Sequence, residues 1–148
     1  MNEKLSGQLS KKYINLFKYW DDRKGMYIIP DDINNFNYYI GVGDGWYDIL
    51  DELLNVINIE MNKDIYVKEN FIINDIKEKF GGLRFYISGG NDIIDKAIDI
   101  AEDKSYKTCE FCGKPGINMK LCGWYATECD THHEQRKLKY KEMNKNND

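Results

Sequence analysis

The stretch Phe71-Ile72-Ile73-Asn74-Asp75-Ile76-Lys77-Glu78-Lys79-Phe80-Gly81-Gly82-Leu83-Arg84-Phe85-Tyr86-Ile87-Ser88 predicts the sheet on which the rest of the chain packs. A two-residue Gly81-Gly82 loop suits a hairpin turn that needs positive φ. With that turn, one face of the hairpin is a core face made of Ile76, Phe80, Leu83, Phe85 and Ile87. The sequence therefore predicts a β-hairpin over residues 71–88.

The predicted register makes the second face of this hairpin basic and aromatic. Lys79 lies opposite Arg84, and Lys77 lies opposite Tyr86 on the same face. Like charges directly opposite each other destabilise an antiparallel pair, so an anion beside them would explain the cluster. That anion is either a phosphate, which both side chains bind well, or a protein carboxylate, for which the candidates are Asp44, Asp48 and Glu78. The alternative is a solvated strand face.

Trp46 is a further candidate contact for such a ligand. It follows the glycine-rich turn at 41–45, which we expect to be flexible, and it stands at a predicted helix start, where free backbone N–H groups bind anions. The competing interpretation is that Trp46 anchors the core. The candidate ligand-binding residues are therefore Trp46, Lys77, Lys79, Arg84 and Tyr86.

Three segments with a helical spacing of apolar residues accompany the hairpin. They cover residues 5–20, about 46–61, and about 93–106 with Asp92 as the N-cap. Together these elements predict an α+β fold, in which a small antiparallel hairpin or sheet packs with three helices and a C-terminal zinc knuckle.

We expect a single domain over residues 1–148, because this length is enough to bury a core. An N-terminal helix and an irregular segment with one short strand occupy 1–40, and a helix–hairpin–helix core occupies 41–107. The zinc knuckle follows at 108–133. The charged tail at 134–148 lacks an apolar face, and we expect a frayed helical extension or disorder.

Paired metal ligands follow the third helix. Cys109 and Cys112 form a C-x-x-C pair followed by a glycine, and Cys129 and His132 form a C-x-x-H pair. Zinc favours four such ligands in a tetrahedron, and a spacing of two residues lets tight turns supply neighbouring corners. We therefore expect Cys109, Cys112, Cys129 and His132 to bind Zn²⁺. Four protein ligands leave no open position for water, so the expected zinc is structural.

Alternative ligand sets remain open at the level of sequence. Cys122 could replace Cys129 or His132, and His133 could replace His132, although Cys122 lies in a setting more typical of a strand or turn. A catalytic metal would need three protein ligands and a nearby general base, for which the candidates are Glu110 and Glu128.

Charge and hydropathy narrow the function classes. The net charge of -4 argues against a general DNA-binding protein, whose affinity comes from neutralising phosphates. No apolar run is long enough to span a bilayer, and the first residues lack the apolar stretch of a signal peptide. We therefore expect a cytoplasmic protein without a membrane partner, whose reduced thiols favour a metal site over disulfides.

Several segments occur in an order that resembles a known family. They are Gly45-Trp46-Tyr47 with Ile49-Leu50, the Lys77–Tyr86 string, Ala101-Glu102 with Ser105, Cys109-Glu110-Phe111-Cys112-Gly113, and Trp124, Thr127, Cys129 and His132. The chain resembles small, largely uncharacterised phage and prophage proteins with a K-E-K-F-G-x-L-R-F-Y hairpin and a C-terminal zinc knuckle. The resemblance covers about residues 41–133. Cys122 departs from it, which keeps the alternative ligand sets open.

The resemblance implies a phage origin, and small accessory phage proteins often counter host immunity. The expected function is a non-enzymatic zinc-binding inhibitor of host anti-phage defence, acting in the bacterial cytoplasm, that binds an anionic ligand such as a nucleotide immune signal. One alternative is a zinc-dependent nucleic-acid-binding regulator that uses the knuckle and the lysine-rich tail. Others are a protein–protein inhibitor of a defence enzyme and a small nucleotide-processing enzyme.

Overall fold

The computed structural model describes residues 1–32 and 38–145. Over these residues the chain forms five α-helices and three two-stranded antiparallel sheets, with a cluster of cysteine and histidine side chains near its C-terminal end. The predicted α+β class is confirmed. Residues 33–37 of the expected irregular segment and 146–148 of the expected tail lie outside the described residues.

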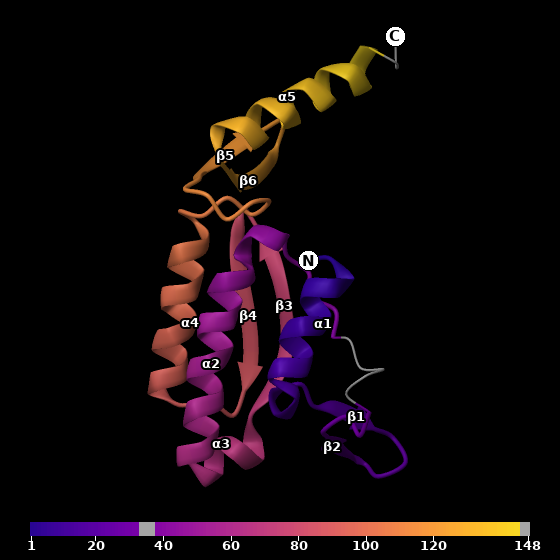
Figure 1. Ribbon diagram of the computed structural model, residues 1–148, viewed down its shortest axis with the longest axis vertical. Helices are drawn as coiled ribbons and strands as arrows, with labels where there is room; N and C mark the ends of the chain where they lie inside the picture. The colour runs from indigo at the N-terminus through magenta and orange to yellow at the C-terminus, as the bar shows by residue number, and fades with distance from the viewer. Residues whose placement is uncertain (33–37, 146–148) are drawn as a thin grey trace.

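Figure 1 shows a body made of helices and the β3–β4 hairpin, from which α5 projects at one end. The helices are α1 (Glu3–Lys12), α2 (Tyr47–Lys63), α3 (Ile65–Asn70), α4 (Asp92–Ser105) and α5 (Asp130–Lys145). The strands pair as hairpins in chain order: β1 (Tyr19–Asp21) with β2 (Met26–Ile28), β3 (Ile72–Lys79) with β4 (Gly82–Ser88), and β5 (Ile117–Leu121) with β6 (Trp124–Glu128). Short 3₁₀ turns lie at Ile14–Leu16 and Asp44–Trp46.

The central hairpin exists as predicted, but its turn lies one residue earlier than predicted, so the partners of Lys77 and Lys79 on β4 shift by two residues. Lys79 pairs with Gly82, so the loop is Phe80-Gly81, and Lys77 lies opposite Arg84. Both loop residues have positive φ, +55° and +77°, as a type I′ turn requires. Phe80 is 62% exposed and does not belong to the core face.

Packing against α4 explains why the second glycine lies in the strand. A Cβ on Gly82 would lie 2.3 Å from Cζ of Tyr106, just beyond the end of α4. Gly82 therefore permits a close approach between hairpin and helix, and the turn falls one residue earlier. A hairpin register depends on such contacts as well as on turn composition.

The first predicted helix is too long. α1 ends at Lys12, and its apolar positions continue through a 3₁₀ turn, where Leu16 and then Phe17 become fully buried. The chain then reverses into β1, so Trp20 lies on a strand, is 51% exposed and packs edge-on against Tyr27 of β2. A helical spacing of apolar residues does not by itself show where the helix ends, because residues after a turn can pack on the same core.

Helix capping accounts for two further differences. α4 is capped by Asn91 and not by Asp92, because the Asn91 Oδ1 accepts hydrogen bonds from the backbone N–H groups of the first turn. α3 was not predicted; it is short and begins at Ile65, and the carboxylate of the preceding Asp64 caps it in the same way. None of the described helices is long and apolar enough to cross a membrane.

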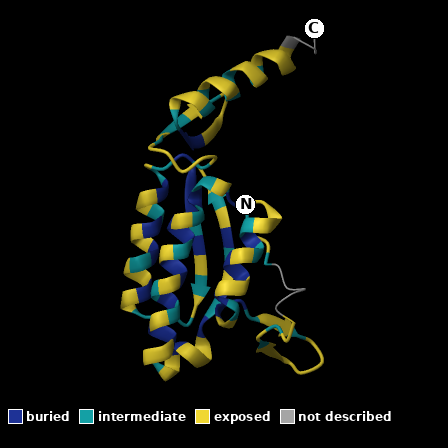
Figure 2. Cartoon of the chain, viewed as in Figure 1, coloured by how far each residue is buried: buried dark blue, intermediate teal, exposed yellow. Residues whose placement is uncertain are grey.

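The core is formed by α2, α4 and the β3–β4 hairpin, with contributions from the N-terminal segment. All residues of the buried apolar cluster lie between Leu9 and Ala101. The Ser105 hydroxyl ties α4 to β4, because it accepts from the Leu83 N–H (2.8 Å) and donates to the Glu102 carbonyl (2.6 Å). Figure 2 shows buried residues throughout this body and mostly exposed residues along α5.

Candidate metal centre

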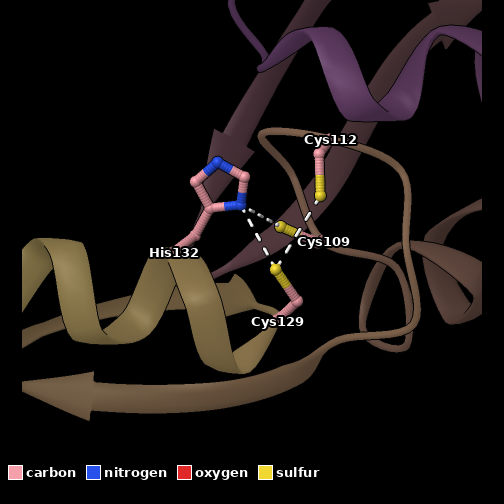
Figure 3. Close-up of side chains that lie close together, drawn as sticks. All are labelled: Cys109, Cys112, Cys129 and His132. Carbon is pink, nitrogen blue, oxygen red and sulfur yellow. Dashed lines mark hydrogen bonds between the residues drawn. The ribbon is translucent and has the colours of Figure 1, made fainter.

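Four side chains converge where the body meets β5, β6 and α5. One donor atom each from Cys109, Cys112, Cys129 and His132 lies within 4.8 Å of every other (Figure 3). Nδ1 of His132 is 3.2 Å from Cys129 Sγ and 3.4 Å from Cys109 Sγ. The Sγ atoms of Cys112 and Cys129 are 3.8 Å apart. These are the four residues that the sequence predicts as ligands.

The spacing of the donors fits zinc. Zn–S bonds of about 2.3 Å and Zn–N bonds of about 2.0–2.1 Å place the corners of a tetrahedron roughly 3.5–3.8 Å apart. The three distances above lie close to such edges. A set of three thiolates and one imidazole is also the donor chemistry of structural zinc sites. The cluster can therefore hold a metal ion, and Zn²⁺ is the ion that fits best.

Local chain geometry brings the donors together. Cys109 and Cys112 lie in a tight turn closed by Gly113, whose N–H donates to the Cys109 carbonyl (2.9 Å) and whose φ of +75° favours glycine. Cys129 follows β6, and His132 lies in the first turn of α5. The β5–β6 hairpin therefore brings Cys129 and His132 back beside Cys109 and Cys112.

The two thiols that approach His132 differ electrostatically. The pKa of the Cys129 thiol is lowered to about 6, first by a hydrogen bond from the His132 backbone N–H. Burial raises the pKa of the Cys109 thiol. Cys129 is therefore prepared as a thiolate before a metal arrives, whereas Cys109 gains from the charge of the ion itself.

The rival ligands lie elsewhere. Cys122 occupies the two-residue turn between β5 and β6, is exposed, and interacts with Tyr140 of α5. His133 points to a different partner, since its Nδ1 lies 3.0 Å from Oε2 of Glu128. Both alternatives therefore lose support from the geometry.

Glu128 anchors α5 to the β5–β6 hairpin. Its side chain is fully buried, forms an ion pair with Arg136 Nε (2.7 Å), and lies within hydrogen-bond distance of the His133 ring. Arg136 also donates to the backbone carbonyls of Met119 and Trp124, both at 3.3 Å. Glu128 was considered as a general base, and these contacts instead give it a structural environment.

The glycine-rich turn packs against the knuckle. The Gly43 N–H donates to Oε1 of Glu110 (3.0 Å), and the Gly45 N–H donates to the Glu110 carbonyl (2.7 Å). A Cβ on Gly45 would lie 2.2 Å from the Cys109 carbonyl oxygen, and one on Gly43 would lie 2.3 Å from the Glu110 carbonyl oxygen. Glycine is needed here for close approach, and these contacts hold a turn that the sequence suggests is flexible.

Trp46 belongs to the same junction. It is fully buried, and its Nε1 donates to the Thr108 carbonyl (2.8 Å). The competing interpretation of Trp46 as a core anchor therefore describes its position, and a ligand on the surface does not reach it. Trp46 connects the core to the backbone just before Cys109.

The other candidate ligand contacts divide between the face and the tip of the hairpin. On the face, Lys77 pairs with Asp75 (2.5 Å) and lies over the Tyr86 ring, and the Asp75 contact raises the pKa of Lys77. Arg84 hydrogen-bonds to Tyr106, which raises its pKa, and lies 3.6 Å from a carboxylate oxygen of Glu102. The protein carboxylates beside these cations are therefore Asp75 and Glu102, and not the three that the sequence suggested.

At the tip, Lys79 stands apart from the other predicted cations. Its Nζ lies 5.4 Å from the centre of the Phe80 ring. It faces the β5–β6 hairpin across a groove that also contains Trp124 and Tyr125. Sequence reasoning missed this groove, although the Cys122-Gly123 pair between alternating segments is a recognisable hairpin signal.

Comparisons of the chain with protein-family models, with curated proteins and with solved structures find no match. The geometry of the chain itself therefore carries the argument about function.

Proposed function

We propose that the protein is a zinc-stabilised, non-enzymatic binding protein whose ligand carries both an aromatic base and a phosphate. One observation carries the proposal: three lysine ammonium groups lie over aromatic rings on the two larger hairpins. Lys77 lies 5.1 Å from the Tyr86 ring centre, Lys79 lies 5.4 Å from that of Phe80, and Lys120 lies 5.2 Å from that of Tyr125.

Each of these pairs offers the two contacts that a nucleotide needs, although the Lys77 ammonium is shared with Asp75. An exposed ring provides a stacking surface for a base, worth ~1–3 kcal/mol per base. The neighbouring ammonium provides a point charge for a phosphate. All three rings are more than two-fifths exposed, so a ligand can reach them.

The metal is assigned a structural role because the donor set is complete. Three thiolates and one imidazole occupy all four corners of a tetrahedron, which leaves no position for a substrate or an activated water. In the phage setting that the resemblance implies, the protein would bind a nucleotide immune signal without changing it and so inhibit host defence. That setting rests on the resemblance and not on the geometry.

A single-stranded nucleic acid is the second candidate ligand, and the distribution of charge favours it. Residues 107–148 contain eight Lys or Arg and six Asp or Glu, whereas residues 1–106 contain thirteen and nineteen. The basic residues of the C-terminal part include Arg136, Lys137, Lys139 and Lys141 on α5. This local excess, unlike the net charge of -4, suits a phosphate backbone.

Calorimetric titration of the zinc-loaded protein tests the proposal. The probes are adenosine monophosphate and a short single-stranded adenosine oligonucleotide, and the variant combines Lys77→Glu with Lys79→Glu. Binding should weaken about tenfold or more, because hydrogen bonds to charged groups contribute ~1.5–3 kcal/mol each. The matched control combines Lys4→Glu with Lys96→Glu, which makes the same charge change on exposed helix surfaces. If neither probe binds, or if both double variants weaken binding equally, the proposal fails.

A further inference from the structure

A groove lies between the tips of the β3–β4 and β5–β6 hairpins. We call it the inter-hairpin groove; its volume is about 350 Å³ and it is lined by Glu78, Lys79, Phe80, Gly123, Trp124 and Tyr125. This volume falls within the range of roughly 300–1,000 Å³ that small-molecule sites occupy. The crevice between α2 and α4 is smaller, about 100 Å³, and mostly apolar, so it does not suit a phosphate.

Direct contacts between the tip of the β3–β4 hairpin and the open end of the β5–β6 hairpin, opposite its turn, hold the two hairpins together. Thr127 Oγ1 donates to the Gly81 carbonyl (2.5 Å), and Asn118 Nδ2 donates to the Phe80 carbonyl (3.0 Å). A Cβ on Gly81 would lie 2.1 Å from Asn118 Nδ2, so this approach requires glycine. The groove is therefore formed before any ligand arrives, which lowers the ordering cost of binding.

Phe80 is an unfavourable residue for the turn that it occupies. Its φ of +55° lies in the left-handed region, where asparagine or glycine is preferred and a bulky side chain is uncommon. Its ring is 62% exposed, so the core gains little from it. An aromatic residue that neither the turn nor the core favours indicates a role at the surface.

The surroundings of Phe80 complete an aromatic and cationic surface. Tyr125, 41% exposed, meets the Phe80 ring edge-on at 6.2 Å, and Trp124 is 77% exposed. Lys79 and Lys120 lie over the Phe80 and Tyr125 rings. The one carboxylate among the lining residues, that of Glu78, accepts a hydrogen bond from the Gly81 N–H (2.5 Å). An anion in the groove therefore meets Lys79 among the lining residues, with Lys120 nearby over the Tyr125 ring, beside a carboxylate that the turn already engages.

We infer that the inter-hairpin groove binds one unpaired nucleotide unit, with its base on the exposed aromatic rings and its phosphate beside Lys79 and Lys120. The inference rests on the proposed function and places its site at the groove, not at the Lys77–Tyr86 face. Bases in a duplex have their faces covered by their neighbours, so the unit comes from a free nucleotide or from a single strand.

The test uses the zinc-loaded full chain and two groove variants. Phe80→Asn introduces the asparagine that a type I′ turn prefers, so it should keep or raise the thermal midpoint while it weakens binding. Trp124→Ala removes the most exposed tryptophan. Each variant should weaken binding about fivefold or more, given the usual effect of removing one stacking ring. Trp20→Ala, on the distant β1 strand, is the matched control and should leave affinity unchanged.

The probes identify the source of the nucleotide unit. Tight binding of adenosine monophosphate supports a free nucleotide, and tighter binding of the single-stranded oligonucleotide supports a strand. A third probe, the duplex of that oligonucleotide with its complement, should bind weakly. If Tyr86→Ala weakens binding while Phe80→Asn and Trp124→Ala do not, the groove is the wrong site and the proposed function stands. If no probe binds the native protein, both the groove and the proposed function are wrong.

Discussion

The body of the protein and its C-terminal module, residues 107–145, are stabilised in different ways. The body buries a continuous apolar cluster between Leu9 and Ala101. Among the described residues of the module, only Cys109 and Ala126 are buried apolar side chains, and Cys109 belongs to the cluster that could hold a metal ion. The comparison indicates that a segment too small to bury a core can be stabilised by its polar contacts and by a metal ion at its Cys/His cluster.

The junction between the two regions uses backbone contacts that only glycine permits. Gly43 and Gly45 contact Glu110, and Trp46 contacts the carbonyl of Thr108. A close fit of this kind allows the state of the module to influence the edge of the body, including the tip of the β3–β4 hairpin.

Removal of the metal should have the largest effect, because it should unfold the module and leave the body folded. We expect a chelator, or Cys112→Ser, to unfold β5, β6 and the start of α5. Structural zinc contributes ~10–16 kcal/mol of apparent binding energy in small domains, and this energy would be lost. Hydrogen exchange followed by mass spectrometry should show fast exchange in the module and retained protection in α2, α4 and β4. Cys122→Ser is the control and should retain zinc and protection. A Cys112→Ser protein with native zinc content would refute the assigned ligand set.

Gly45→Ala tests the junction and should have an intermediate effect. The added Cβ would lie 2.2 Å from the Cys109 carbonyl oxygen, so the two regions must move apart. We expect a loss of about 1–3 kcal/mol in the free energy of unfolding, as is typical of overpacked sites, together with weaker zinc retention. Gly25→Ala is a useful comparison, because Gly25 has a positive φ, +62°, that disfavours alanine but has no neighbour within 4 Å, whereas Gly45 is restricted by its close contacts. Equal effects of the two substitutions on zinc retention would contradict the account of the junction.

Glu110→Gln should have the smallest effect, and its size depends on pH. Burial raises the pKa of Glu110, so the folded state favours the protonated carboxyl, and this stability is lost as pH rises through the raised pKa. Glutamine can still accept the Gly43 hydrogen bond without a charge. The variant should therefore be the more stable protein near neutral pH, by less than about 1 kcal/mol, and the difference should shrink as pH falls. Thermal midpoints of the native protein and the variant, measured from neutral to acidic pH, test this prediction. A variant that is less stable than the native protein at neutral pH would contradict it.

Much of the fold follows from local patterns in the sequence. The apolar spacing of α2 and α4 and the alternation in β3 and β4 predict those elements because period and burial are linked along one segment. The metal donors could also be predicted, since each pair needs only a tight turn to reach neighbouring corners. The β5–β6 hairpin was not predicted, although Cys122 lies in a setting typical of a strand or turn and the Cys122-Gly123 pair forms its turn.

Other features depend on contacts between segments far apart in the chain. The close approach of Tyr106 requires a glycine at position 82 of β4, and the turn therefore falls one residue earlier in the chain. Contacts with Thr108 and Glu110, at the start of the C-terminal module, hold Trp46 and the glycine-rich turn in place.

The sequence by itself determined the ligand spacing, the main helices and the existence of the central hairpin, because each depends on neighbouring residues. Only the tertiary structure decided the hairpin register, the burial of Trp46 and the groove that joins Phe80 to Trp124 and Tyr125. The physical reason is that close packing between distant segments selects among local conformations that short-range patterns leave nearly equal in energy.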